Sequence, residues 1–494
     1  MAESWEISPD KLTITMKVRK NAHFAPLPPT NGRLVDVEDV KASFERYETN
    51  GNRAADMFNS KSPGAPLINV TTPDSSTVVL HLKQPDTVIM GLLAGGSYVD
   101  ILAKEGIAGQ FDLRSTPRGS GPFFVKDHQP SVHTLLERNP AFHLPGAYID
   151  NFDWFYIKEY STLLSQFRGG NIYLMDAQDV SIQDVLPTKK EVPALNLVKE
   201  AIVADQNQQF FGYKDGPLSV FRDERVRQAL SMSYDRDLWI DTFFSVSNFE
   251  KEGLPVATRW SLGGISANVQ GKWALDPQNK IKGQELGENS KYFQYNVAEA
   301  KKLLAAAGFA NGVQTESHHV TTADYGANAP KMIEVLLQMA QDSGFNIKIV
   351  PEAYATAYRN GYRDVKGNFE GTSFVRVSLS DGDDPTNRFF SQYHKTGDLF
   401  KGFDVNGKTP AAGDPELDDL VTKMRTEFDL DKRIALAHQV QKIDAKHQYY
   451  IRFPGGAESF SLAWPAIANY GVYRGGYVHW TYWLDDTKAP LKKA

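Results

Sequence analysis

The stretch Pro330–Val350, PKMIEVLLQMAQDSGFNIKIV, indicates how this chain folds. Proline is favoured at the first position of a helix, and the apolar residues after it recur at the spacing of one helix face: Ile333, Leu336, Leu337 and Ala340. Gly344 ends this predicted helix, because glycine readily adopts the left-handed conformation that closes a helix. The next residues, Asn346–Val350, alternate as a strand does. A helix and a strand joined by a short glycine turn predict α/β layering.

Further helix starts and ends repeat this pattern on both sides of the stretch. Four more helices are predicted to begin after side chains that accept the free N–H groups of a first turn: Asp223, Asn296, Asp414 and Asp429. The helix after Asn296 has Glu299 at its third position and Gly308 at its end. From about Tyr213 to Ile451, helices therefore alternate with strands.

The two ends of the chain read differently from this central part. Leu12–Lys20 alternates as a strand, Asp36 and Asp39 form the start of a helix, and Val78–Leu82 alternates again, so the first hundred or so residues read as a small α+β unit. Between about Arg118 and Phe211 the pattern is mostly short strands, with one helix near Ser161–Phe167. The aromatic tail from Ala463 to Trp483 is strand-like.

The length and composition of the chain exclude several classes of protein. A single core rarely exceeds about 250–300 residues, so 494 residues predict two or three lobes. Lys and Arg number 54 against 60 Asp and Glu, a net charge of −6, which excludes a general nucleic-acid binder. The chain has no cysteine, and this excludes disulfides, thiolate zinc sites and cysteine nucleophiles. Its most apolar stretch, Thr87–Ala103, is too interrupted by glycine and polar residues to form a membrane span.

The sequence contains motifs that resemble catalytic or phosphate-binding motifs, but the residues around them do not fit. Gly402–Thr409, GFDVNGKT, fits the spacing of a phosphate-binding loop, but Pro410 follows where a helix must start. The histidines contain no pair with zinc-site spacing, and we expect the adjacent His318 and His319 to lie at the surface. A pair of carboxylates that hydrolyses glycosides stays open as an alternative, because no single pair stands out among the acids.

The acidic run Asp381–Asp384 is open to three interpretations. It departs from a calcium-binding loop, since Thr386 stands where that loop needs glycine. It also fits a turn closed by Pro385, or a carboxylate at a strand end that binds a cation. Four tryptophans are able to stack on a sugar or a peptide, although we expect core packing for most of them: Trp260, Trp464, Trp480 and Trp483.

Six segments, in order along the chain, resemble the family 5 extracytoplasmic solute-binding proteins. This family contains the oligopeptide- and dipeptide-binding components of ABC importers. FRDERVRQAL at Phe221–Leu230 is very close to a motif of that family, and GSGPF at Gly119–Phe123 is similar to another. The other matching segments are Ala2–Glu6 with Leu12–Lys20, Gly32–Phe44, Arg138–Phe142 and Tyr295–Gly308.

The resemblance implies an α/β fold of the two-lobed type II periplasmic-binding-protein class, with an additional small α+β lobe and two hinge strands. Residues 1–115 would form the small lobe, 116–209 with 456–494 the first ligand-binding lobe, and 210–455 the second. The hinge strands are expected near Gln206–Tyr213 and Tyr449–Pro454. Ligand would be enclosed when the lobes close about these strands.

The resemblance also implies a function without catalysis. The protein would capture peptides, or a related amine-bearing solute, in a cleft between lobes and deliver them to the permease subunits of an ABC transporter. It would act as a monomer, with no cofactor, no metal and no nucleic-acid partner. Other members of the family take up oligosaccharides, opines or metal chelates, and a non-peptide solute is therefore the alternative.

Five residues are predicted to bind the ligand. In peptide-binding members an aspartate four residues before a proline pairs with the ligand's ammonium group, and Asp381 stands four before Pro385. The backbone of Val377, Ser378 and Leu379 would pair with an extended ligand, and Trp260 would contact it. Ser378 departs from the family, whose peptide-binding members have a tryptophan there, and this departure supports the alternative of a non-peptide solute.

The start of the chain does not fit a secreted protein of this family. Met1–Ile7 has neither the basic nor the apolar segment of a signal peptide, and members of the family have further residues before this strand. We therefore expect that N-terminal residues, including strands of the first ligand-binding lobe, are missing here. The expected location is periplasmic, or extracytoplasmic with a membrane anchor.

Overall fold

The computed structural model describes all residues except 97, 178, 270, 327, 378–383, 473–478 and 492–494. The chain forms two compact units, which we call unit 1 (Met1–Glu200 with Phe460–Ala494) and unit 2 (Ala201–Ser459). It thus enters unit 2 after Glu200 and returns to unit 1 after Ser459. The three-lobe division expected from the sequence stays a prediction.

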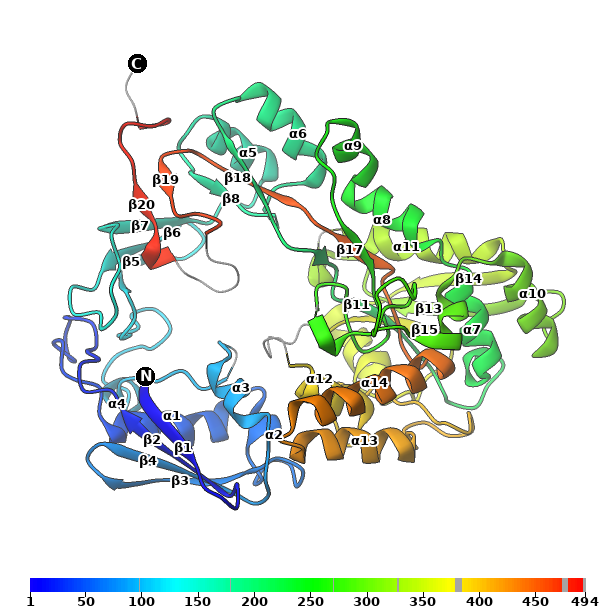
Figure 1. Cartoon of the computed structure of the whole chain (residues 1–494), viewed down its shortest axis with the longest axis horizontal. Coiled ribbons are helices and arrows are strands. Elements are labelled where there is room, and N and C mark those ends of the chain that lie inside the picture. Colours follow the sequence, from blue (N-terminus) through cyan, green and yellow to red (C-terminus); the bar gives the residue numbers. More distant parts are fainter. Residues whose placement is uncertain are drawn as a thin grey trace. The chain divides into compact units, whose positions relative to one another are not determined.

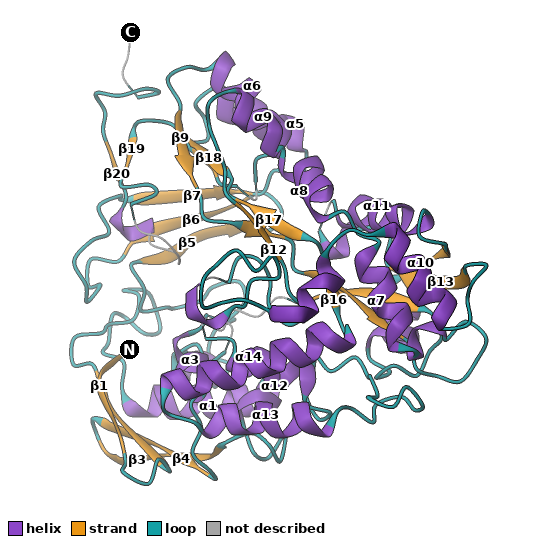
Figure 2. Ribbon diagram, turned by 45° about the vertical axis from the view of Figure 1, so that its right-hand side comes forward, coloured by secondary structure: helices purple, strands orange, loops and turns teal. Residues whose placement is uncertain are grey.

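Unit 1 begins with a small α+β part (Figures 1 and 2). A four-stranded antiparallel sheet has the order β1-β2-β4-β3: β1 (Ala2–Ile7), β2 (Thr13–Val18), β4 (Thr77–Leu82) and β3 (Leu67–Asp74). Helix α1 (Val37–Asn50) packs on it, and short helices follow: α2 (Ala54–Met57), α3 (Ile89–Ala94) and α4 (Lys104–Ile107). The predicted capping box is confirmed, because Asp36 and Asp39 each accept the other's backbone N–H at 3.0 Å.

Short strands dominate the rest of unit 1, as predicted, and α5 (Tyr160–Arg168) confirms the helix expected near Ser161–Phe167, but the helix α6 (Ile182–Glu191) was not predicted. A three-stranded antiparallel sheet is formed by β5 (Phe123–Gln129), β6 (His133–Arg138) and β7 (Asn151–Phe155). A second has the order β8-β18-β9: β8 (Leu174–Met175), β18 (Phe460–Ala463) and β9 (Asn196–Lys199). The other elements are η6 (His479–Thr481) and the pair β19 (Ile467–Ala468) with β20 (Trp483–Leu484). Strand β18 shows that the C-terminal segment completes a sheet of unit 1.

Unit 2 is built around a mixed five-stranded sheet. Its order is β14-β13-β15-β11-β16: β14 (Phe345–Pro351), β13 (Val313–His319), β15 (Thr372–Arg376), β11 (Asn207–Phe211) and β16 (Ile451–Arg452). Strand β13 is parallel to β14 and β15, whereas β11 is antiparallel to β15 and β16. A smaller sheet has the order β10-β17-β12: β10 (Val203–Ala204), β17 (Gly455–Ala457) and β12 (Thr258–Trp260).

Helices surround the five-stranded sheet (Figure 2) and share one large apolar core with it. The α-helices of unit 2 are α7 (Glu224–Met232), α8 (Arg236–Phe244), α9 (Val246–Lys251), α10 (Val297–Ala306), α11 (Ala329–Gln341), α12 (Thr386–Tyr393), α13 (Pro415–Thr426) and α14 (Leu430–His447). The short helices are η1 (Val220–Arg222), η2 (Gly271–Trp273), η3 (Gly287–Phe293), η4 (Ala323–Tyr325) and the π-helix η5 (Tyr354–Arg363).

The helix–turn–strand unit read from Pro330–Val350 is confirmed. Helix α11 ends at Gln341, Gly344 has φ +96°, and β14 begins one residue later. The predicted caps hold as well, since the side chains of Asp223, Asn296, Asp414 and Asp429 all accept a first-turn N–H. These signals are local in sequence, so the order of α/β layers could be read before any tertiary contact was known.

Two further expectations are decided by the structure. The loop Gly402–Thr409 feeds no helix, and the Asp404 carboxylate already accepts the N–H groups of Lys408 and Thr409, which a phosphate would need. The surface position expected for the two histidines is wrong for His319, which is 1% exposed. His319 is the last residue of β13, which is an inner strand of the sheet. Helices and neighbouring strands cover the inward side chains of this strand.

Candidate functional site

The segment expected to bind ligand follows strand β15. Ser378, Leu379 and Asp381 lie outside the described residues, but the chain is held on both sides of them. On one side, the N–H of Val377 donates to the backbone oxygen of Gln206 at 3.0 Å, which continues the pairing of β15 with β11. On the other, the Asp384 carboxylate accepts the N–H of Thr386 and Nη2 of Arg433, both at 3.0 Å. Residues 378–383 thus join two fixed points.

Val377 and Trp260 are the predicted site residues that the structure describes. Val377 is 1% exposed as a whole residue, and its N–H is already paired with Gln206, so its contact with a ligand stays a prediction. Trp260 is 8% exposed, and its Nε1 donates to Oδ1 of Asp237 at 2.7 Å. The Arg236 guanidinium lies 5.8 Å from the centre of the Trp260 ring. Trp260 is therefore part of the core of unit 2, and its contact with a ligand stays a prediction.

A half-buried carboxylate lies beside the end of β15. Asp205 precedes β11, and its Oδ1 accepts the N–H of Asn207 at 2.7 Å and the Asn207 Nδ2 at 2.5 Å. Asn207 pairs in register with Arg376, the last residue of β15. Burial raises the pKa of Asp205, while the Asn207 hydrogen bonds and the charges of Arg376 and Arg452 oppose that rise. A second acid thus lies at the strand end from which Asp381 follows.

Arg452 brings a buried positive charge to the same strands. It lies on β16, is 4% exposed, and donates from Nε to the backbone oxygen of Gly263 at 2.8 Å. Its Nη2 has no hydrogen-bond partner among the described residues. Burial, and to a lesser degree the charge of Arg388, lower the pKa of Arg452 to about 9. A guanidinium with a free donor is able to bind an anionic or carbonyl group.

Asp444 on α14 is the carboxyl group that lies behind this cluster. It is 1% exposed, and burial raises its pKa to about 7. The backbone of Gly263 passes so close that a Cβ there would lie 1.4 Å from Oδ2 of Asp444. The pKa of Tyr393, which packs beside the same glycine, is raised well above its usual value by burial. The arrangement is a dense polar core behind the strand ends.

The sequence reading missed Asp205, Arg452 and Asp444. A signal was present in DQNQQ at Asp205–Gln209, because a run of acid and amide residues is unusual in a strand buried on both faces. Arg452 and Asp444 gave no local signal. They meet the other residues only because β16 returns beside β11 from more than two hundred residues away.

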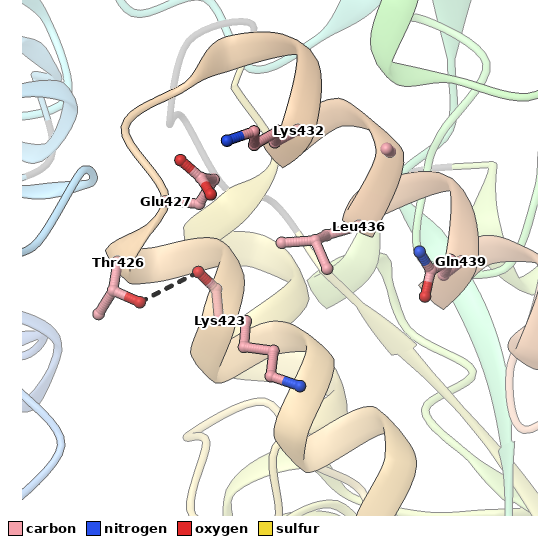
Figure 3. Close-up of a pocket in the computed structure, with 7 residues that line it drawn as sticks. Lys423, Thr426, Glu427, Lys432, Leu436 and Gln439 are labelled. Atoms are coloured by element: carbon pink, nitrogen blue, oxygen red, sulfur yellow. Dashed lines mark hydrogen bonds between the residues drawn. The ribbon is translucent and has the colours of Figure 1, made fainter.

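Unit 2 also contains a groove between two of its helices. A groove of about 390 Å³ lies between α13 and α14, with Lys423, Thr426, Glu427, Lys432, Ala435, Leu436 and Gln439 along it (Figure 3). Its polar contact in Figure 3 is structural, with Thr426 Oγ1 donating to the backbone oxygen of Lys423 at 3.2 Å. Across the described part of the chain, no three or more His, Asp or Glu side chains gather as a metal site would require, and no helix is both long and apolar enough to cross a membrane.

Comparison with known proteins decides the family. Residues 1–399 match the model of the family described as bacterial extracellular solute-binding proteins, family 5 Middle. The chain belongs to this family. The resemblance read from the sequence motifs is thereby confirmed.

Individual relatives of this family 5 protein are distant in sequence. A putative ABC transporter peptide-binding protein of Brucella ovis is 25% identical over 398 residues, covering 78% of this chain and 66% of its own. Di/tripeptide-binding protein 1 of Pseudomonas aeruginosa is 25% identical over 468 residues, covering 90% of this chain and 78% of its own. The chain thus spans 66% of the length of the Brucella relative.

Solved structures confirm the fold class of the family 5 protein. The periplasmic binding protein DppA of Helicobacter pylori, in complex with the peptide STSA, has a TM-score of 0.70 at 21% identity, covering 98% of this chain and 88% of its own. AgaA of A. tumefaciens R10, in complex with agropinic acid, has a TM-score of 0.70 at 19% identity, covering 98% and 89%. The α/β periplasmic-binding-protein fold predicted from the sequence is therefore correct.

Proposed function

We propose that this family 5 protein is the peptide-binding component of an ABC importer and that Asp381 holds the ammonium group of the peptide. The observation that carries the proposal is the pair of fixed points around residues 378–383. Val377 is paired with β11, and Asp384 is paired with α12 and α14. Fixed positions on both sides of a ligand-binding segment reduce the conformational freedom that the chain loses on binding.

The chemistry of a strand end suits an extended peptide. Residues 377–379 follow β15 in the sequence, and a strand added there would gain main-chain hydrogen bonds without a demand on side-chain identity. An ammonium group adds a charge-assisted bond to a carboxylate, which is about twice as strong as a neutral hydrogen bond. The names of the Brucella and Pseudomonas relatives, both peptide-binding proteins, support the same ligand class.

Calorimetry on two variants tests the role of Asp381. Removing one partner of a desolvated charge pair costs about 2–5 kcal/mol, so Asp381→Asn should weaken peptide binding at least about tenfold. The matched control is Asp383→Asn, which removes the same charge two residues away and should leave affinity nearly unchanged. N-acetylation of the peptide should reproduce the Asp381→Asn effect. If Asp381→Asn or the acetylated peptide binds as tightly as the wild-type pair, Asp381 is a turn residue and not an anchor.

A non-peptide solute is the second candidate, and Ser378 favours it. The expected tryptophan platform is absent from the sequence at this position, while two arginines, Arg376 and Arg452, stand beside the strand end. These would suit a ligand with carboxylate groups. AgaA, whose complex contains agropinic acid, has the same fold. Competition between a peptide mixture and opine-like acids in the same calorimeter separates the two ligand classes.

The biological setting follows from the proposed function. A solute-binding protein of an importer works outside the cytoplasmic membrane, free in the periplasm or anchored, and transfers its ligand to permease subunits. We propose that this chain acts there as a monomer and that it releases its ligand unchanged. Membership of a family of extracellular solute-binding proteins supports this setting.

A further inference from the structure

A second charged cluster in unit 2 joins the loop before β15 to the segment that carries Lys401. Its centre is Asp364, the residue after the π-helix η5. Three cations approach this one carboxylate: Arg359 Nε at 3.3 Å, Arg363 Nη1 at 3.4 Å and Lys401 Nζ at 3.8 Å. Asp364 is therefore shared between three cations, and none of the three contacts is short.

Lys401 is the unusual member of the cluster. Its side chain is 2% exposed, although lysine is almost never fully buried without a close partner. The carboxylate nearest to its ammonium group is that of Asp364, beyond hydrogen-bond distance. Burial, and after it the charges of Arg363 and Lys366, lower the pKa of Lys401 to about 8, while Asp364 and Asp398 oppose this change. The geometry thus buries a cation beside other cations.

Arg363 has unused donor capacity at the same place. Its side chain is 22% exposed, and its Nε is buried with no hydrogen-bond partner among the described residues. Positive charges outnumber negative ones around Lys401 and Asp364. The cations are Arg359, Arg363, Lys366 and Lys401, and the carboxylates are Asp364 and Asp398. Lys401 is the fully buried member of this group, and a buried positive charge is costly unless an anion completes it.

The backbone around the cluster is held firmly. The N–H of Lys401 donates to the Tyr450 hydroxyl at 3.0 Å, and that hydroxyl donates to the backbone oxygen of Gln392. Gly402 packs so closely on the neighbouring loop that a Cβ would lie 1.8 Å from the backbone oxygen of Lys366. The loop that carries Asp364 and the segment that carries Lys401 are therefore fixed against each other, as the donors of a binding site must be.

We propose that Arg359, Arg363 and Lys401 form a binding site for a small oxyanion of the phosphate or sulfate class. Guanidinium forks and an ammonium group match the oxygen geometry of such anions, and the anion would supply the missing negative charge. The cluster draws Arg359 and Arg363 from before β15 and Lys401 from the segment after α12, and none of these residues belongs to the proposed peptide segment 377–381. The length of β15, five residues, places the two strand ends about 13 Å apart.

Titration of the full chain with inorganic phosphate, and separately with sulfate, tests the site at constant ionic strength maintained with chloride. Calorimetry of the wild type should show saturable binding of one anion per chain. Losing one charged donor should weaken binding about tenfold or more, so we expect this from both Arg363→Gln and Lys401→Met. Because these side chains are partly or fully buried, Arg359→Gln, whose side chain is 51% exposed, keeps the test valid if the others do not fold. Peptide affinity should not change in Arg359→Gln.

The matched control is Lys423→Gln, on α13. Lys423 pairs with Asp419 and is 60% exposed, so its loss removes a surface charge without touching the cluster. The proposal is supported if the control binds as the wild type does while the cluster variants are weakened. It is overturned if neither anion shows saturation below about 10 mM, if Arg359→Gln binds as tightly as the wild type, or if Lys423→Gln weakens binding equally.

Discussion

At the scale of single residues, the burial of Asp444 makes the unfolding free energy depend on pH. An aspartic acid in an unfolded chain has a pKa near 3.9, whereas burial raises the pKa of Asp444 to about 7. The folded protein therefore holds a proton that the unfolded chain releases between these two values. Stability is highest below the lower value and falls as pH rises towards the upper one, at about 1.4 kcal/mol per pH unit.

We predict that Asp444→Asn removes this loss, because asparagine has the shape of the protonated acid and does not ionise. Between about pH 5 and pH 7 the wild type should lose about 2 kcal/mol of unfolding free energy through this group, relative to the variant. Denaturant unfolding at both pH values measures the difference. Asp431→Asn, an 84% exposed aspartate on the same helix, is the control and should follow the wild type. Parallel pH profiles for wild type and Asp444→Asn would contradict the account.

Gly263 is predicted to tolerate no side chain. A Cβ there would meet Oδ2 of the buried Asp444 at 1.4 Å and the Tyr393 hydroxyl at 3.2 Å, so Gly263→Ala must displace a packed core. We expect a loss of about 2 kcal/mol or more in unfolding free energy, measured by denaturant. Gly361→Ala is the matched control, since nothing lies within 4 Å of its Cβ position. An equal effect of both substitutions would show that the close approach is not what matters.

At the scale of elements, helix starts carry a measurable share of stability. The Asn296 side chain accepts the N–H of Glu299 at 3.0 Å at the start of α10, and Asn296→Ala should cost about 1 kcal/mol. Ser181 precedes α6 without a side-chain capping bond, so Ser181→Ala should cost much less. Thermal or denaturant unfolding compares the two. A Ser181→Ala loss as large as that of Asn296→Ala would mean that the capping bond contributes nothing.

In unit 1, Arg33 joins two helices through buried acids. It donates to both carboxylate oxygens of Asp39 at 2.7 Å and to those of Glu105 at 2.7 and 2.6 Å. The Asp39 side chain is 0% exposed, so losing its partner leaves a buried charge. We predict that Arg33→Met costs about 3 kcal/mol in unfolding free energy. Arg114→Met, at an exposed arginine, is the control, and a loss below about 1 kcal/mol for Arg33→Met would contradict the buried-pair argument.

Elements were predictable from the sequence where their signals are local. Asp36, Asn296 and Gly344 mark helix ends through contacts with residues three or four positions away, and all three were placed correctly. His319 was misplaced because its burial depends on β15, which joins β13 only in the folded sheet. Buried charges such as Arg452 and Lys401 escaped notice for the same reason, since lysine and arginine in a sequence read as surface residues.

At the scale of the whole molecule, the family and its fold were readable because six motifs occur in order along the chain. The ligand was not readable in the same way. Asp381 rests on one spacing to Pro385, and Ser378 departs from the peptide-binding pattern at that very site. The two-unit division likewise reflects long-range pairing, since β18 returns to unit 1 after more than two hundred and fifty residues in unit 2.

The central claim is that this family 5 protein holds a peptide and releases it unchanged. Native mass spectrometry, after incubation with a mixture of di- to pentapeptides and removal of unbound material, tests it most directly. The account predicts one intact peptide mass per chain, lost on N-acetylation of the mixture, with no shorter fragments appearing in the supernatant. A chain that retains no peptide, or a supernatant in which cleavage products accumulate, would contradict it.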